Sequence, residues 1–204
     1  MSTNVTEIKK RIRILTDEYS SAYLSDSQFT TLWSKASYIF FGKLISKFQA
    51  TRKVTEDLQP LITSANVSVT DYEIDLDSVS NYWKLINVKP TYTVSGKTYS
   101  KYARELKASE KGAVFSQGSY MYPRYVFAAS TLYLYPETGS CSTALLEFFI
   151  KPYELDFTDG ADSAPYDLDI VDGIVYEFAN QLALLQREDL FFTQTNFEIE
   201  ESPE

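Results

Sequence analysis

Apolar residues recur every three or four positions in the first quarter of the chain, and this spacing predicts two amphipathic helices. The first apolar stripe runs from Val5 to Ala22, and the second begins at Phe29 and continues to about Arg52. Because only a short polar connection separates the two stripes, we expect these helices to form an antiparallel hairpin.

Two local patterns support the limits of these helices. Ser25 and Gln28 have the spacing of a capping box, in which each side chain binds a backbone N–H of the other residue, so a helix is expected to begin there. Glu7 and Arg11 lie four positions apart on the polar side of the first helix, where opposite charges can pair.

The apolar period changes to two between Val67 and Leu155, which predicts a small, mostly antiparallel sheet or sandwich. Ser95-Gly96 is placed as a hairpin turn, and residues 100–119 are expected to form a helical turn and a long loop. The expected strands, three of them ended by proline, are "VSVTDYEIDL", "YWKLINVKP", "YVFAASTLYLYP" and "ALLEFFIKP".

Helical spacing returns near the C-terminal end of the chain. Ser163 is placed to cap this helix and Pro165 to occupy its first turn, and a buried stripe runs from Ile170 to Leu185. Gly173 interrupts the pattern, which indicates a close contact with another helix.

These elements predict an α+β fold in which antiparallel helices from both termini pack with a small, mostly antiparallel β domain inserted between them. The expected parts are a helical hairpin (residues 1–62), a β domain (63–158), a helix that completes the helical domain (159–190) and an acidic aromatic tail (191–204).

Composition supports a folded chain with large contact surfaces. Hydrophobic residues make up 44% of the 204 positions, and the 16 Tyr and 13 Phe favour strands and interfaces. No apolar run is long enough to cross a bilayer, the N-terminus does not resemble a signal peptide, and Cys141 is the single cysteine. We therefore expect a soluble protein made in a cytoplasm.

The charge is distributed unevenly. Residues 1–150 hold 17 Lys and Arg against 14 Asp and Glu, whereas residues 151–204 hold 2 against 14. An acidic C-terminal part does not attract DNA as a specific ligand, and it suits either a head-to-tail contact between copies or a wall past which DNA slides. The alternative is that the acidic surface only maintains solubility.

The residue types present exclude several kinds of catalytic site. The chain has no histidine, one cysteine and 7 glycines that are not clustered, so histidine-based triads, zinc sites and glycine-rich phosphate loops are ruled out. The remaining weak candidates for a metal site are Asp156, Asp159 and Asp162, although a hydrated loop before an acid-favouring helix start is the simpler explanation of these acids. We expect no enzyme activity and no cofactor.

Aromatic residues are the candidates for contacts with other subunits. In the last part of the chain they have no local core to enter, so they either fold back on their own subunit or anchor in the groove of a neighbour. The contact candidates are Phe41, Tyr133, Tyr135, Phe191, Phe192 and Phe197.

The order of three segments, which together cover about Tyr122 to Asp189, carries a resemblance to a known family. A strand ending in "LYLYPETG" is followed by "LLEFFIKPYEL" and then by the helix of "PYDLDIVDGIVYEFANQLALLQRED". This arrangement resembles the head-to-tail adaptor, or ring, proteins of short-tailed bacteriophages, particularly those of crAss-like phages. The N-terminal helices agree with the family in type and order.

The resemblance implies a structural protein of the virion, assembled in the bacterial cytoplasm. Such a subunit forms a homo-oligomeric ring, with twelve copies expected, that binds the portal protein and other tail or ring proteins. The ring extends the DNA channel and provides a platform for the next tail component; DNA passes through without sequence-specific binding, and no membrane is involved.

Two other function classes remain open. The β domain is also compatible with a binding module for glycan or a host surface, in which Tyr and Trp side chains stack on sugar rings. A carboxylate or metal-dependent hydrolase is the third possibility, and it would use Asp156, Asp159 and Asp162.

Overall fold

The computed structural model describes residues 3–16, 24–51, 56–106 and 118–200, with side chains placed up to Gln186. The chain has an α+β fold and divides into two compact units. We call residues 1–60 and 152–204 the helical unit and residues 61–151 the β unit. Residues 152–158 belong to the helical unit, so the β unit ends at residue 151 and not at residue 158, where the sequence pattern placed the end of the β domain.

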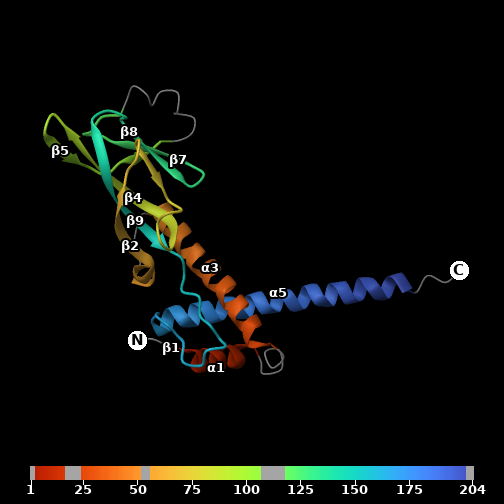
Figure 1. Ribbon diagram of the computed structural model, residues 1–204. Helices are drawn as coiled ribbons and strands as arrows, with labels where there is room; N and C mark the ends of the chain where they lie inside the picture. The colour runs from red at the N-terminus through yellow and green to blue at the C-terminus, as the bar shows by residue number, and fades with distance from the viewer. Residues whose placement is uncertain (1–2, 17–23, 52–55, 107–117, 201–204) are drawn as a thin grey trace. The chain divides into compact units, whose positions relative to one another are not determined.

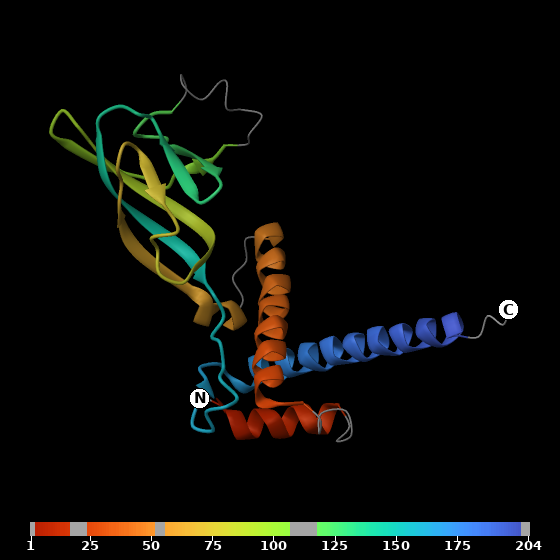
Figure 2. The same ribbon diagram turned by 45° about the vertical axis from the view of Figure 1, so that its right-hand side comes forward.

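The helical unit contains α1 (Val5–Leu15), α3 (Asp26–Thr51) and α5 (Leu168–Glu200), and η1 (Glu56–Leu61) follows α3 at its boundary. Both α1 and α3 pack mainly against α5 rather than against each other (Figures 1 and 2). The predicted antiparallel hairpin is therefore wrong, because the apolar faces of both N-terminal helices are buried by a helix far along the chain. The continuation of the first helix to Ala22 lies outside the described residues.

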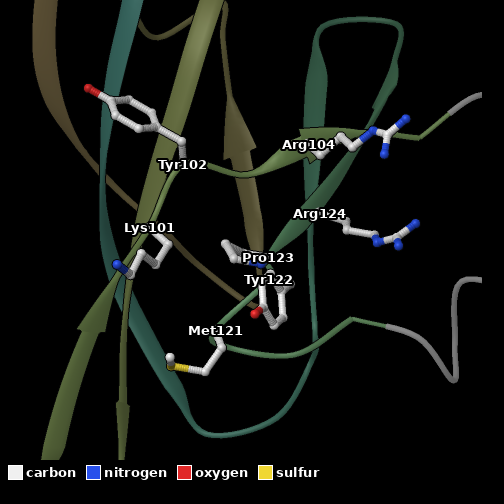
Figure 3. A pocket seen from close by; sticks show the side chains of 7 residues that line it. All are labelled: Lys101, Tyr102, Arg104, Met121, Tyr122, Pro123 and Arg124. Atoms are coloured by element: carbon white, nitrogen blue, oxygen red, sulfur yellow. The ribbon is translucent and has the colours of Figure 1, made fainter.

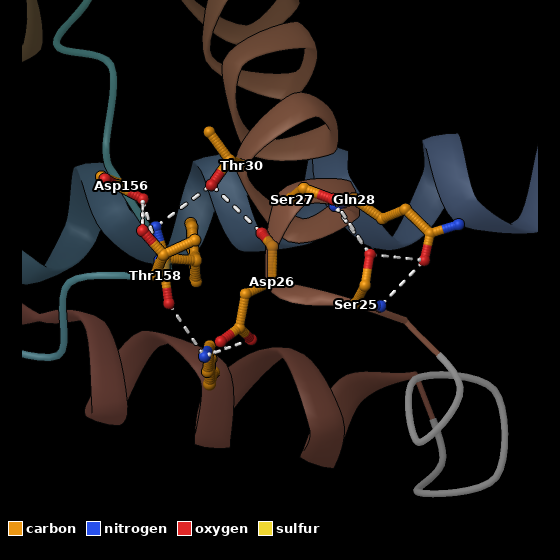
Figure 4. Close-up of polar contacts among 9 residues, drawn as sticks. Ser25, Asp26, Ser27, Gln28, Thr30, Asp156 and Thr158 are labelled. Atoms are coloured by element: carbon orange, nitrogen blue, oxygen red, sulfur yellow. Dashed lines mark hydrogen bonds and ion pairs between the residues drawn. The ribbon is translucent and has the colours of Figure 1, made fainter.

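Both predicted local patterns in the N-terminal helices are confirmed. The Ser25 N–H donates to Gln28 Oε1 at 2.8 Å, and the Gln28 N–H donates to Ser25 Oγ at 3.3 Å, which forms the capping box at the start of α3 (Figure 4). Arg11 pairs with Glu7 at 3.2 Å, and it also binds Asp172 of α5 at 2.6 Å.

Three segments meet around Lys9 of α1. Its ammonium group contacts Asp26 Oδ1 at 2.6 Å and donates to the Phe157 carbonyl at 3.1 Å, and it lies over the ring of Phe29. The Phe157 N–H in turn donates to Thr30 Oγ1 at 3.1 Å. Lys9 thus joins α1, the start of α3 and the returning chain within one subunit.

The core of the helical unit is rich in stacked aromatic rings. Phe29 lies 5.5 Å from Phe157 and 5.6 Å from Phe178, and Trp33 meets Phe157 edge-on at 5.9 Å between ring centroids. Because Phe157 belongs to the loop before α5, the returning chain forms part of the core rather than only linking two units.

The beginning of the C-terminal helix differs from the prediction. Ser163 and Ala164 form strand β10 (Ser163–Ala164), which pairs with β1 (Thr3–Asn4), and α5 begins at Leu168. Ser163 therefore does not cap the helix, because the first residues of the chain supply it with a backbone partner. At the other end α5 continues to Glu200, so the segment 191–200, predicted as a tail, is helical.

The β unit is a sandwich of two four-stranded sheets, and the apolar faces of both sheets contribute to one core. The first sheet has the order β2-β9-β4-β5 and the second β3-β8-β7-β6. The strands of the first sheet are β2 (Ile62–Ser68), β9 (Ser140–Ile150), β4 (Tyr82–Val94) and β5 (Lys97–Ser100). Those of the second are β3 (Glu73–Asp75), β8 (Thr131–Tyr135), β7 (Arg124–Ala128) and β6 (Arg104–Glu105).

Two turn and strand predictions have different outcomes. Ser95 and Gly96 both have positive φ, 50° and 76°, and form the two-residue turn between β4 and β5, as expected. Pro90 does not end its strand, since β4 continues to Val94. The Val88 carbonyl accepts a hydrogen bond from the Ala103 N–H, so the polar backbone groups of Val88 point away from β9. Pro90 lies two residues further along the strand, and its backbone nitrogen points to the same side. Its lack of an N–H therefore removes no hydrogen bond between β4 and β9.

Candidate interaction site

The carboxylates proposed as weak metal ligands bind their own loop. Asp162 Oδ1 accepts from the Tyr153 hydroxyl and the Ser163 N–H, both at 2.7 Å, and Oδ2 accepts from the Asp156 N–H at 2.8 Å. Asp156 Oδ1 accepts from the N–H and the hydroxyl of Thr158 at 2.8 and 2.7 Å. These oxygens therefore hold the turn that leads into β10.

The pKa values of both carboxyl groups reflect these bonds. The Thr158 hydroxyl and N–H lower the pKa of Asp156. Burial alone would raise the pKa of Asp162, but hydrogen bonds from the Asp156 N–H and the Tyr153 hydroxyl outweigh it and lower the pKa. Asp159 Oδ1 accepts a hydrogen bond from the Ala161 N–H at 2.9 Å. Across the described ranges, no three His, Cys, Asp or Glu side chains lie close enough together to hold a metal ion.

A hollow of about 580 Å³ lies on the β unit, between the end of β5 and the strands β6 and β7 (Figure 3). Its lining combines three cationic side chains with two tyrosines, a methionine and a proline. We call it the basic pocket, and it is formed by Lys101, Tyr102, Arg104, Met121, Tyr122, Pro123 and Arg124.

Backbone pairing brings the two arginines of the basic pocket together. β6 runs parallel to β7, and Arg104 is the register partner of Arg124. Both side chains extend to the same side of the strands (Figure 3). Like charges at directly paired positions repel each other, and no ion pair within the described residues neutralises either guanidinium. The pair is therefore suited to an anion supplied from outside the β unit.

Aromatic side chains complete the pocket. Tyr122 is 77% exposed and Tyr102 is 54% exposed, values that leave both rings open to a partner. The Tyr102 hydroxyl donates to Glu147 Oε1 at 2.8 Å, which raises the pKa of this tyrosine, and Lys89 lies over its ring at 5.5 Å. Tyr102 is thus held by Glu147 and Lys89 of the first sheet, and it also contributes to the lining of the pocket.

The predicted contact residues are not gathered in one place. Phe41 is fully buried in the helical unit, with its ring 5.3 Å from those of Phe40 and Tyr166, so its assignment as a partner contact is wrong. Phe41 lies on the buried face of α3 together with Ser37 and Ile45, and the loop that carries Tyr166 covers it.

The other predicted contact residues lie on two elements. Tyr133 and Tyr135 alternate with the buried Leu132 and Leu134 of β8, so both tyrosines lie on the outer face of the second sheet. Tyr135 packs there against a small cluster of Leu106 and Val126. The backbone of Phe191, Phe192 and Phe197 belongs to α5, and their side chains lie outside the described part.

Sequence reasoning missed the basic pocket. Arg104 lies in a stretch expected to be a helical turn and loop, and 20 positions separate it from Arg124. Only the parallel pairing of two short strands brings the two side chains together. The only signal in the sequence was the excess of basic over acidic residues in the stretch 100–119. Such an excess does not specify which residues of two strands pair with each other.

No protein-family model matches the chain, and a search of curated proteins finds no match. Within the described residues, no helix combines the length and the apolar character needed to cross a lipid bilayer.

Proposed function

We propose that this chain is a structural virion protein that assembles with copies of itself into a ring at the head-to-tail junction of a short-tailed phage. The ring extends the DNA channel below the portal and presents a platform to the next tail component. The proposal draws on the order of strands and helices from Tyr122 to Asp189 and on the exposed surfaces of the helical unit.

The observation that carries the proposal is the outer half of α5, residues 183–200. Leu182 is the last residue of α5 that the structure describes as buried, and the next four residues are all exposed, with Leu184 at 51% and Leu185 at 38%. Both views show this half continuing past α1 and α3 (Figures 1 and 2). Most helical stability in proteins comes from packing of an apolar face, so a half-helix whose described side chains are exposed is suited to cover by a partner molecule.

Further exposed apolar side chains lie on the helical unit. Tyr176, 63% exposed, shares the outer face of α5 with Leu184, and Ile14 and Leu15 at the end of α1 are 72% and 50% exposed. Contiguous exposed apolar patches are typical of surfaces that other subunits cover, and these side chains are the candidates for such a patch on the helical unit.

The charge of the helical unit agrees with a channel component. It holds 10 Lys and Arg against 20 Asp and Glu. A surface of this sign repels the phosphate backbone, so a ring of such subunits would let DNA pass without retaining it. The proposed ring has twelve copies, and the portal and the next tail protein are its neighbours.

Quantitative mass spectrometry and electron microscopy of purified phage particles test the function. We expect the chain in a copy number equal to that of the portal protein, or in a fixed ratio to it, and a ring of its density at the junction. Absence from purified particles would refute the proposal.

A truncated chain ending at Gln186 provides a variant for the same test. It keeps every residue that the structure describes as buried in the helical unit and removes residues 187–204. We expect it to fold with nearly unchanged thermal stability and to fail to enter particles. Incorporation at the normal copy number would show that the outer half of α5 is not an assembly element.

A further inference from the structure

The second sheet of the β unit carries opposite charges on its two edge strands. Strand β3 forms one edge and strand β6 the other. Positive charge lies at the β6 edge, in the basic pocket. Negative charge lies at the β3 edge, which we call the acidic edge and which consists of Asp71, Glu73, Asp75 and Asp77.

The acidic edge is open to a partner. Glu73 and Asp75 are exposed and alternate with the buried Ile74, so their side chains lie on the outer face of the sheet. Two positions along a strand are about 7 Å apart, which spaces the carboxylates regularly. No described cation pairs with these two residues or with Asp71.

The basic pocket lacks the anion that its geometry favours. Arg104 and Arg124 stand side by side without a carboxylate partner among the described residues, and Lys101 lines the same hollow. Guanidinium groups bind carboxylates through two parallel hydrogen bonds, so two adjacent arginines suit a pair of carboxylates on one strand.

We propose that the acidic edge of one copy docks into the basic pocket of the next copy. This inference rests on the proposed ring function and names the contact that would join neighbouring β units. The two surfaces differ and lie on opposite edges of one sheet, so each copy can bind one neighbour through each edge. Repeating such a head-to-tail contact closes a ring when its rotation divides a full turn.

Charge-reversal variants of the full chain test the contact. The first variant carries Glu73→Lys and Asp75→Lys, and the second carries Arg104→Glu and Arg124→Glu. In the first variant the two altered positions on the edge have the same sign as the pocket, and in the second the two altered positions in the pocket have the same sign as the edge. Sedimentation velocity at low salt should therefore show self-association weakened by about tenfold or more relative to the unaltered chain. In an equimolar mixture, alternating copies restore opposite charges at the altered positions of every contact and should recover association.

A matched control for the pocket variant carries Lys84→Glu and Lys97→Glu, which change the charge of the β unit by the same amount as Arg104→Glu and Arg124→Glu but outside the pocket. We expect it to associate like the unaltered chain. Thermal unfolding followed by circular dichroism verifies that all variants are folded. If both edge and pocket variants associate like the control, or if their mixture fails to recover association, the inference is wrong.

Zero-length carbodiimide cross-linking locates the contact. In a mixture of isotopically labelled and unlabelled chains, we expect Lys101 of one copy to be linked to Glu73 or Asp75 of another. A chain that is monomeric at low salt and gives no such link overturns the inference. So does binding of a short DNA oligonucleotide that the Arg104→Glu, Arg124→Glu variant abolishes while its self-association is unchanged, since the pocket would then bind nucleic acid.

The proposed ring function is tested separately, by the presence of the chain in purified particles. If particles contain the chain in many copies while the charge variants associate normally, the docking contact fails and the proposed function stands. If the chain is absent from particles, the proposed function fails whatever the variants show in solution.

Discussion

The ring of Phe40 on α3 lies directly against Gly173 on α5. A Cβ atom built at Gly173 would come within 2.8 Å of Phe40 Cζ, which is closer than side-chain atoms pack. The glycine therefore allows the two helices to approach, as its position in an otherwise regular helical pattern predicted.

Replacing Gly173 by Ala should lower the free energy of unfolding by about 1 kcal/mol, because the clash with Phe40 exceeds the gain in helix propensity. Urea unfolding followed by circular dichroism measures this change. In a Phe40→Ala background the same substitution should become stabilising.

Gly42 of α3 supplies the matched control for that experiment. A Cβ atom there meets nothing within 4 Å, so Gly42→Ala should raise the free energy of unfolding by up to about 1 kcal/mol. Equal effects at both glycines would contradict the interpretation of Gly173 as a contact position.

Replacing Ser37 by Ala should stabilise the helical unit. The Ser37 hydroxyl is fully buried in α3 and has no hydrogen-bond partner among the described residues, and an unsatisfied buried hydroxyl is unfavourable. We expect a gain of about 1 kcal/mol in urea unfolding. Ser46→Ala is the control, since the exposed Ser46 hydroxyl already donates to the Gly42 carbonyl at 2.8 Å. A gain of the same size for Ser46→Ala would show that the unsatisfied hydroxyl of Ser37 is not the cause.

Replacing Lys43 by Met should destabilise the contact between α3 and α5. Lys43 Nζ lies 2.6 Å from Glu177 Oε2, and the Glu177 side chain is only 9% exposed. Loss of the cation leaves a nearly buried carboxylate whose other oxygen has, among the described residues, only Gln181 as a partner, at 3.4 Å. We expect a loss of about 1–2 kcal/mol in urea unfolding, limited by the solvent exposure of the lysine.

Two further variants test that explanation. Adding Glu177→Gln to Lys43→Met should recover part of the loss, because the uncompensated charge is removed. Lys47→Met, on an exposed side chain of the same helix, should change stability by less than about 0.5 kcal/mol. A similar loss at both lysines would indicate a general effect of charge on α3.

Acid should destabilise the loop before β10. The pKa of Asp156 and that of Asp162 are lowered in the folded chain, so on acidification the unfolded chain takes up protons first. Their contribution to stability is complete above the unfolded pKa of about 4 and is lost as pH falls through the folded values. Asp162→Asn should flatten the fall of unfolding free energy between about pH 5 and about pH 3, measured by urea unfolding at each pH. An unchanged slope would contradict this assignment.

Local patterns were readable from the sequence because their partners are close along the chain. Ser25 and Gln28 are three positions apart, and Ser95-Gly96 is a two-residue turn, so the residues themselves specify the geometry. The fold class followed from the change of apolar period from helix to strand and back.

Features that depend on distant partners could not be read in the same way. Ser163 becomes part of a strand only because Asn4 pairs with it. The basic pocket depends on the register between Arg104 and Arg124, which no local pattern specifies. The burial of Phe41 depends on Tyr166, whose loop folds back over α3.

The insertion of the β unit also determines the order in which the chain can fold during synthesis. All of residues 61–151 leave the ribosome before any residue of α5, so the sandwich can close while α1 and α3 still expose their apolar faces. The helical unit can close only after Leu182 emerges, and the nascent protein carries unburied aromatic side chains such as Phe29 and Trp33 until then.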